Sequence, residues 1–365
     1  MTVAAVSSFK SPLHQMTATT PTCLWSDSVS TQDLPYSIEH GAVGATCNPV
    51  IVVGALKKEI DAWRERIQSL VQEMPIATED EIAWQLVREM SIKAAALLKR
   101  VFDEQRGRNG RLSIQTDPRL FRDSKAMEKQ ALEFNQLAPN MIVKIPVTSA
   151  GIPAIEEATY RGISINATVC FTVPQCIAVA EAVERGLVRR EREGKDIATM
   201  GPVCTIMVGR LDDWLKVLAE KDNVSVDPGY FEWAGVAVFK KTYRIFTERG
   251  YRLRLLSAAF RNHMHWSEFI GGDVVISPPH AWQVRFNASD IAIRSRIHEA
   301  VSGEIVEELN RRFRDFRRAY AEDGLTIAEF DTFGPTVRTL RQFIAACHDL
   351  DGVIREFLLP NPDLS

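Results

Sequence analysis

A single lysine interrupts an apolar, strand-like run in the middle of the chain, residues 141–146 with the sequence MIVKIP. Side chains alternate between the two faces of a strand, so Lys144 shares a face with Ile142. A run that is apolar on both faces is typical of a buried parallel sheet, where a cation is costly unless it is paired or loses its proton. We therefore expect burial to lower the pKa of Lys144, and a neutral amine is the form that attacks a ketone to give a Schiff base. The alternative is that Lys144 extends from a strand end and keeps its charge in water.

The next strand-like run, residues 164–169, carries polar side chains at alternate positions: Ser164, Asn166 and Thr168. These three share one parity, so they lie on one face of the strand. They could satisfy only local backbone groups. Two neighbouring strands that direct an amine, an amide and hydroxyls inward are more typical of a site, and the same pattern recurs along the chain.

Strand-like and helical runs alternate from end to end, which favours parallel βα units. The strand-like runs are 22–27, 43–48, 111–116, 141–146, 164–169, 202–208, 252–258 and 273–277. This number of units predicts an α/β fold, a (β/α)8 TIM barrel, with extra helices after the second strand and at the C-terminus. The longest predicted helices are 55–73, 79–106, 230–248, 294–320 and 336–357. Because no linker divides the chain, we expect one domain over 21–365 and a loosely attached polar tail over 1–20.

In such a barrel the functional groups lie at the carboxyl ends of the strands, on inward-facing positions. Nearly every predicted strand ends on polar side chains: Asp27, Asn48, Ser113 with Gln115, Lys144, Asn166 with Thr168, Thr205 followed by Arg210, and Ser257 followed by Arg261. Two arginines at strand ends can hold a phosphate through charge-assisted, bidentate contacts. Packing alone does not place so many polar groups at one end of a barrel.

Composition excludes several other classes of protein. A net charge of −3 gives no electrostatic reason to expect nucleic acid or a membrane surface as partner. No run approaches the roughly 18 apolar residues of a membrane span, so we expect a soluble protein. The six cysteines are scattered without a CxxC pair, which favours reduced thiols of a cytoplasmic protein over a zinc site or a disulfide framework.

Two further motifs have plain explanations. The arginine-rich stretch 311–318 contains Phe313 and Phe316 and lies among glutamates, so we interpret it as a solvated helix face over a packed apolar stripe and not as a nucleic-acid patch. His263 and His265 have a spacing that two metal ligands can have, but no carboxylate motif accompanies them, and we expect no metal there.

Several segments together resemble the transaldolase family, from about Trp25 to at least Pro278. They are residues 45–49 (ATCNP), 143–146 (VKIP), 162–168 (GISINAT), 208–214 (VGRLDDW) and 260–262 (FRN). The resemblance implies a class I aldolase-type barrel that moves a dihydroxyacetone unit between sugar phosphates, with no metal or organic cofactor.

The resemblance also implies roles for individual residues. Lys144 corresponds to the Schiff-base lysine, Asp27 to the acid/base at the C4 hydroxyl, and Thr168 to a hydroxyl that holds a catalytic water. The substrate-binding residues are Asn48 and Asn166 for hydroxyls of the dihydroxyacetone unit, Thr205 beside them, and Arg210 and Arg261 for the phosphate.

Three positions depart from the common transaldolase pattern. Gln115 stands where most members have a glutamate; as a catalytic residue it can orient water but cannot take its proton. The fructose 6-phosphate aldolase branch also has glutamine there, but pairs it with a tyrosine where this chain has Met207. Ala259 replaces a serine that usually supports the phosphate.

The resemblance therefore predicts transaldolase-type transfer from sedoheptulose 7-phosphate or fructose 6-phosphate to an aldose phosphate, in the pentose phosphate pathway. The alternatives are an aldolase that releases dihydroxyacetone or acts on a modified sugar, and a barrel that binds a sugar phosphate without turning it over. The expected partners are sugar phosphates, in the cytoplasm, without nucleic acid or membrane, and a homodimer is left open.

Overall fold

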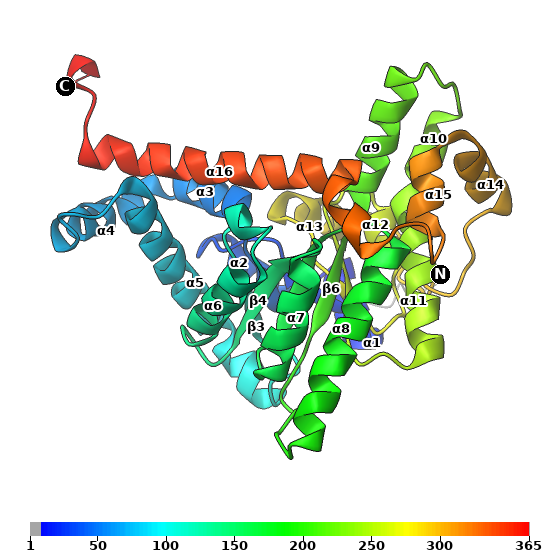
Figure 1. The fold of residues 1–365 in the computed structure, drawn as a ribbon, viewed down its shortest axis with the longest axis horizontal. Helices are drawn as coiled ribbons and strands as arrows, with labels where there is room; N and C mark the ends of the chain where they lie inside the picture. Colours follow the sequence, from blue (N-terminus) through cyan, green and yellow to red (C-terminus); the bar gives the residue numbers. More distant parts are fainter. Residues whose placement is uncertain (1–8, 365) are drawn as a thin grey trace, which may run out of the picture.

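The computed structural model describes residues 9–364, and its centre is a closed barrel of eight parallel strands that follow one another in chain order (Figure 1). The strands are β1 Cys23–Ser26, β2 Ala42–Thr46, β3 Arg111–Gln115, β4 Met141–Pro146, β5 Ile165–Cys170, β6 Val203–Met207, β7 Arg254–Ala258 and β8 Val275–Ile276. The barrel closes where β1 pairs with β8. The predicted (β/α)8 barrel is confirmed, and each strand overlaps its predicted range.

The inside of the barrel is filled by a small apolar cluster drawn from strands around the whole circle: Trp25, Ile142, Val203, Leu256, Ala258 and Val275. A separate and larger apolar layer lies between the strands and the surrounding helices. Ile142 belongs to the interior cluster, so Lys144, two residues later on the same face, also points inward. Apolar packing thus occupies the interior before Lys144, and polar side chains follow it toward the carboxyl ends of the strands.

Helices surround the strands. After α1 they are α2 Asp33–Glu39, α3 Pro49–Lys58, α4 Ile60–Glu73, α5 Glu79–Glu104, α6 Ser124–Asn135, α7 Gly151–Tyr160, α8 Val173–Arg192, α9 Val208–Lys221, α10 Pro228–Phe231, α11 Ala234–Arg249, α12 Met264–Ser267, α13 His280–Asn287, α14 Gly303–Arg312, α15 Arg314–Tyr320 and α16 Gly334–Leu358. Short 3-10 turns lie at Pro118–Leu120, Ile327–Thr332 and Pro362–Leu364. The start of α5 carries a capping box, in which Thr78 and Glu81 satisfy each other's backbone N–H groups.

Two predicted helices are wrong in their bounds. The range 55–73 is broken at Glu59, whose side chain turns inward and is almost fully buried. There it accepts hydrogen bonds from the hydroxyls of Ser30 and Thr31, so a local polar contact ends α3 and starts α4 at a new angle. The range 294–320 is helical only from residue 303 onward, in α14 and α15. Phe313 and Phe316 are buried there, as expected for a helix face over an apolar stripe.

The N-terminal segment is more ordered than a loose tail. Pro12–Thr19 form α1, which Ser11 caps by accepting a hydrogen bond from the backbone N–H of His14. Leu13 and Met16 are fully buried, and the Met16 sulfur accepts a hydrogen bond from the Trp266 indole over 3.2 Å. The prediction of a loosely attached tail is therefore wrong for residues 12–19, and residues 1–8 lie outside the described part of the chain.

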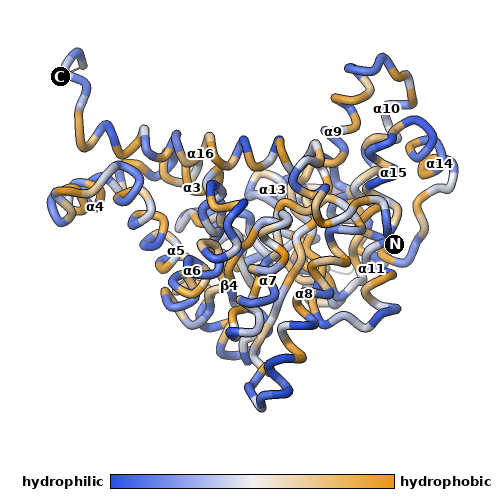
Figure 2. The backbone as a smooth tube through the Cα atoms, in the orientation of Figure 1, coloured by the Kyte–Doolittle hydropathy of each residue, from blue (hydrophilic) through white to orange (hydrophobic). Residues whose placement is uncertain are grey.

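The C-terminal helix α16 crosses the barrel at the end where the site lies, from α9 to α3 and α4 (Figure 1). Hydrophobic and hydrophilic stretches alternate along it (Figure 2), and residues such as Thr339, Phe343 and Cys347 are buried at helical spacing. None of the helices in residues 9–364 is both long and apolar enough to span a membrane.

Candidate active site

Three of the predicted site residues lie side by side on neighbouring strands. In the parallel register Gln115 of β3 pairs with Lys144 of β4, and Lys144 pairs with Asn166 of β5. Thr168 pairs with Pro146, one inward-facing position further toward the carboxyl ends. Lys144 is only 2% exposed, so the alternative in which it reaches water from a strand end is wrong.

Burial and a neighbouring carboxylate act in opposite directions on Lys144. Desolvation lowers the pKa of Lys144, and the charge of Asp27 offsets part of that effect. Desolvation also raises the pKa of Asp27, while Lys144 and the Thr46 hydroxyl, which donates a hydrogen bond to it, favour the ionised carboxylate. An amine that loses its proton more easily and a carboxylate that gains one more easily can exchange protons with a substrate near neutral pH.

The Asn166 side-chain amide has a fixed orientation. Its oxygen accepts a hydrogen bond of 2.6 Å from the Thr205 hydroxyl, and its nitrogen donates one of 3.0 Å to the Ser113 hydroxyl. One N–H and one oxygen lone pair remain for another partner. Thr205 is thus placed where predicted, and in the structure it positions the Asn166 amide.

Two predicted water-handling residues have buried oxygens without a partner among the described residues. These atoms are Oε1 of Gln115 and Oγ1 of Thr168. Buried polar atoms are normally hydrogen-bonded, so each can accept a hydrogen bond from a bound molecule. Val169, directly after Thr168, has φ of 56°, an unfavourable left-handed conformation for a β-branched residue, and such strain gathers at functional sites.

Asn48 has a local structural role as well as its predicted one. It is the N-cap of α3, and its Oδ1 accepts a hydrogen bond of 3.0 Å from the backbone N–H of Ile51. The cap uses the oxygen and leaves the side-chain NH₂ group as a donor. Asn48 lines a narrow apolar space together with Gln115, which connects it to the same end of the barrel.

The two predicted phosphate-binding arginines line one hollow, with a volume of about 320 Å³. Arg210 lies in the first turn of α9, and Arg261 follows β7. Burial and the charge of Arg261 lower the pKa of Arg210 to about 10, so it stays charged at neutral pH. Arg261 forms a bidentate ion pair with Asp213, with N–O distances of 2.8 to 3.2 Å. Nε of Arg210 is buried without a partner among the described residues.

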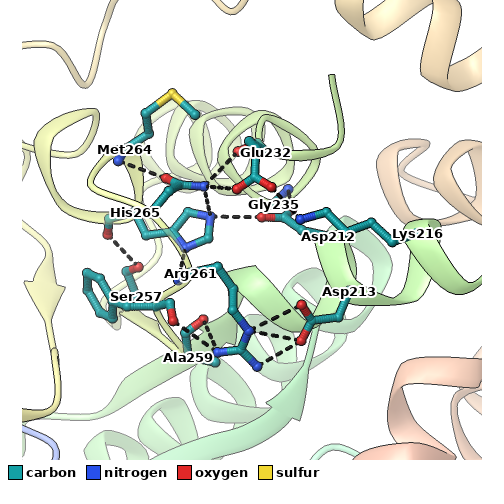
Figure 3. Close-up of polar contacts among 12 residues, drawn as sticks. Asp212, Asp213, Lys216, Glu232, Gly235, Ser257, Ala259, Arg261, Met264 and His265 are labelled. Carbon is teal, nitrogen blue, oxygen red and sulfur yellow. Dashed lines mark hydrogen bonds and ion pairs between the residues drawn. The ribbon is translucent and has the colours of Figure 1, made fainter. Parts of the chain in front are cut away.

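A buried hydrogen-bond network supports Arg261 from behind (Figure 3). The backbone N–H of Arg261 donates to Nδ1 of His265 over 3.0 Å, so the proton of this imidazole is on Nε2, which lies 2.9 Å from a carboxylate oxygen of Asp212. The other Asp212 oxygen accepts from the backbone N–H of Gly235. Ala259, at φ 63°, turns the chain into this loop. His265 is therefore a structural support, and the sequence showed its pairing with His263 without showing the distant carboxylate.

Sequence reasoning missed other neighbours. Arg338, Thr339 and Gln342 of α16 line the hollow with the two predicted arginines, and Nη1 of Arg210 donates to the Thr339 hydroxyl over 3.3 Å. The cysteines are also less scattered than the sequence indicated. Within residues 9–364 the sulfur atoms of Cys170, Cys176 and Cys204 gather within 4.8 Å of one another, fully buried. Only the fold could show these proximities, because the residues lie on different elements.

The fold and the site define a parallel (β/α)8 barrel with an amine, a carboxylate and two arginines at the carboxyl ends of its strands. The family described as Transaldolase/Fructose-6-phosphate aldolase matches residues 24–326, so the chain belongs to this family. The predicted family resemblance is confirmed.

Individual relatives agree with this assignment. The chain is 33% identical over 211 residues to "Transaldolase" of Thermobifida fusca (strain YX), covering 55% of this chain and 56% of that protein. It is 35% identical over 198 residues to "Transaldolase 1" of Streptomyces avermitilis, covering 52% and 51%. For "Transaldolase" of Kocuria rhizophila the identity is 28% over 233 residues, covering 62% of each chain. The chain thus spans about half the length of the first two relatives.

Proposed function

We propose that this chain is a transaldolase that transfers a dihydroxyacetone unit from a ketose phosphate, sedoheptulose 7-phosphate or fructose 6-phosphate, to an aldose phosphate through a Schiff base on Lys144. One observation carries the proposal: Lys144 is buried inside the barrel with a lowered pKa, in register with Gln115 and Asn166 and within the field of Asp27. Family membership supports the reaction class.

In the first step the neutral amine of Lys144 attacks the ketose carbonyl carbon, C2. The resulting carbinolamine loses its oxygen as water, and an iminium forms. The unpaired oxygens of Gln115 and Thr168 can accept hydrogen bonds from that water. The amides of Asn48 and Asn166 hold hydroxyls of the dihydroxyacetone unit.

In the second step Asp27 takes the proton of the C4 hydroxyl and the bond between C3 and C4 breaks. The electron pair of that bond moves into the iminium to give an enamine, and the aldehyde leaves. The retained enamine carbon then attacks the carbonyl of an acceptor aldose, whose new hydroxyl receives the proton from Asp27. Burial raises the pKa of Asp27, which makes it a better base than an exposed aspartate.

Gln115 favours a second candidate function, an aldolase that releases free dihydroxyacetone, because the fructose 6-phosphate aldolase branch also carries glutamine at this position. Met207, in place of that branch's tyrosine, supports transfer. The same enamine would then take a proton instead of an acceptor aldehyde, so the two reactions differ only in what ends the enamine.

One experiment tests the proposal and separates the two functions. Fructose 6-phosphate is supplied with sodium borohydride, and the adduct is located by peptide mass spectrometry; we expect it on Lys144. In parallel, dihydroxyacetone release is measured with and without erythrose 4-phosphate. Transfer with little release supports the transaldolase, and release without acceptor supports the aldolase. An unmodified protein would support the third reading, a barrel that only binds the sugar phosphate.

The remaining expectations stay predictions. They are a place in the pentose phosphate pathway, a cytoplasmic location, a single domain over residues 21–365, and a homodimer as one open choice of oligomeric state. A metal or organic cofactor has no step in the proposed reaction.

A further inference from the structure

The hollow beside the barrel mouth brings together charged residues from three parts of the chain. Its lining consists of Arg210 and Asp213 of α9, Arg261 after β7, and Pro335, Arg338, Thr339 and Gln342 of α16. Arg210 also connects this hollow with the reacting groups, because its charge acts on both Asp27 and Lys144. The hollow therefore lies where one end of a bound substrate would lie.

The lining has more positive than negative charge. Asp213 is its one carboxylate, and it is paired with Arg261. Arg210 has only the neutral Thr339 hydroxyl as hydrogen-bond acceptor. Within residues 9–364 Arg338 makes no hydrogen bond or ion pair; its guanidinium lies 5.9 Å from the centroid of the Trp214 ring. Three guanidinium groups thus face one carboxylate, which leaves two positive charges for a ligand.

An anion with two negative charges would balance this excess. A phosphate monoester is close to a dianion above its second pKa of about 6 and has three acceptor oxygens. A sulfonate carries one negative charge and a hydroxyl none. The planar guanidinium group binds the oxygens of such anions through parallel hydrogen bonds.

We propose that Arg338 of α16 is a third phosphate-binding arginine of this site, and that its charge makes the site selective for sugars that end in a dianionic phosphate over sugars that end in a sulfonate or a hydroxyl. The proposal deepens the proposed function and rests on it. It also gives α16 a part in substrate binding, since that helix supplies Arg338, Thr339 and Gln342.

The test compares Arg338→Gln with Arg341→Gln. Arg341 is an exposed arginine on the same helix that does not line the hollow, so both variants lose the same charge from α16. The value of kcat/KM is measured for fructose 6-phosphate, for 6-deoxy-6-sulfofructose and for fructose. We expect Arg338→Gln to lower the value for fructose 6-phosphate about tenfold to a hundredfold, as for the loss of one charge-assisted contact.

The same variant should lower the value for the sulfonate less and leave the value for fructose unchanged, while Arg341→Gln behaves like the parent on all three sugars. Equal values for the two variants on fructose 6-phosphate, or equal losses of Arg338→Gln on all three sugars, would overturn the proposal.

A binding measurement keeps this proposal separate from the proposed function. Inorganic phosphate is titrated into the full-length parent and both variants by calorimetry at pH 7.5. Weaker binding to Arg338→Gln alone supports the third arginine even if no adduct forms on Lys144. Equal binding to all three proteins contradicts it even if Lys144 forms the adduct.

Discussion

At the scale of single residues, the site holds polar groups that the fold does not need. Lys144 is buried where an apolar side chain would pack without loss of hydration, and the oxygens of Gln115 and Thr168 have no partner among the described residues. Such features cost stability, and proteins tolerate them where function requires them. Two predictions follow from these costs.

Lys144→Met should abolish the borohydride adduct and stabilise the fold. Because folding lowers the pKa of Lys144, the unfolded chain binds more protons, and the parent gains stability as pH rises toward the ordinary lysine pKa. Each unit of that lowering is worth about 1.4 kcal/mol at a pH below both pKa values. The advantage of the variant should therefore shrink between pH 7 and pH 10, as measured by urea unfolding. Lys129→Met, at an exposed lysine, should show no such pH dependence, and a variant less stable than the parent at pH 7 would contradict the argument.

Gln115→Glu should place a proton acceptor beside the water of the carbinolamine steps. General base catalysis contributes about 10²- to 10⁴-fold to a proton-transfer step, so we expect faster transaldolase turnover where that step limits the rate. The new carboxylate would also raise the pKa of a neighbouring acid through repulsion and shift the pH–rate profile. Both are read from turnover with fructose 6-phosphate and erythrose 4-phosphate over a range of pH. If the rate and the profile both equal those of the parent, Gln115 does not touch the catalytic water.

At the scale of elements, the strands were the most predictable part, because burial on both faces leaves a plain pattern of apolar residues with polar ends. Helix bounds were less predictable where a single side chain decided them. Glu59 breaks a helical pattern because its carboxylate finds partners near Ser30, and residues 294–302 have a helix-like composition without forming a helix. Arg338 could not be assigned from sequence, because its approach to Arg210 depends on the path of α16 over the barrel.

Close approach of two elements sets the distance between the arginines. A Cβ at Gly209 would clash with the carbonyl oxygen of Ala259 and lie 2.6 Å from Cγ of Arg261, so α9 and the loop after β7 must separate in Gly209→Ala. We expect the apparent KM for fructose 6-phosphate to rise about tenfold or more with a smaller change in kcat, since phosphate contacts are shared by ground and transition states.

Gly352→Ala is the matched control for this prediction. A Cβ at Gly352 would meet no atom within 4 Å, and the position lies inside α16. Alanine there should stabilise the protein by about 0.5–1 kcal/mol through helix propensity, without any change in KM. Equal kinetics for the two glycine variants would show that the spacing of α9 and the loop does not matter for phosphate.

At the scale of the whole molecule, the cysteines report which layers open together. Cys23 is partly exposed, Cys347 lies under α16, and Cys170, Cys176 and Cys204 lie buried at the wall of the barrel. Segments with fewer buried contacts open at lower free energy than the core. If α16 is a cover that opens locally, its thiol should become reactive before those of the barrel.

Thiol labelling of the native protein, followed by peptide mass spectrometry, should therefore show three phases. Cys23 reacts first. Cys347 reacts next, slowed because burial also raises its pKa to about 12 and the thiolate is the reactive form. The barrel cluster reacts only at the rate of global unfolding. Inorganic phosphate should slow the second phase alone, because Arg338 and Thr339 would bind it from α16, and Cys347→Ser should remove that phase. If Cys347 and Cys170 are labelled at one rate, α16 opens only when the barrel unfolds, and the helix is part of the core and not a separate cover.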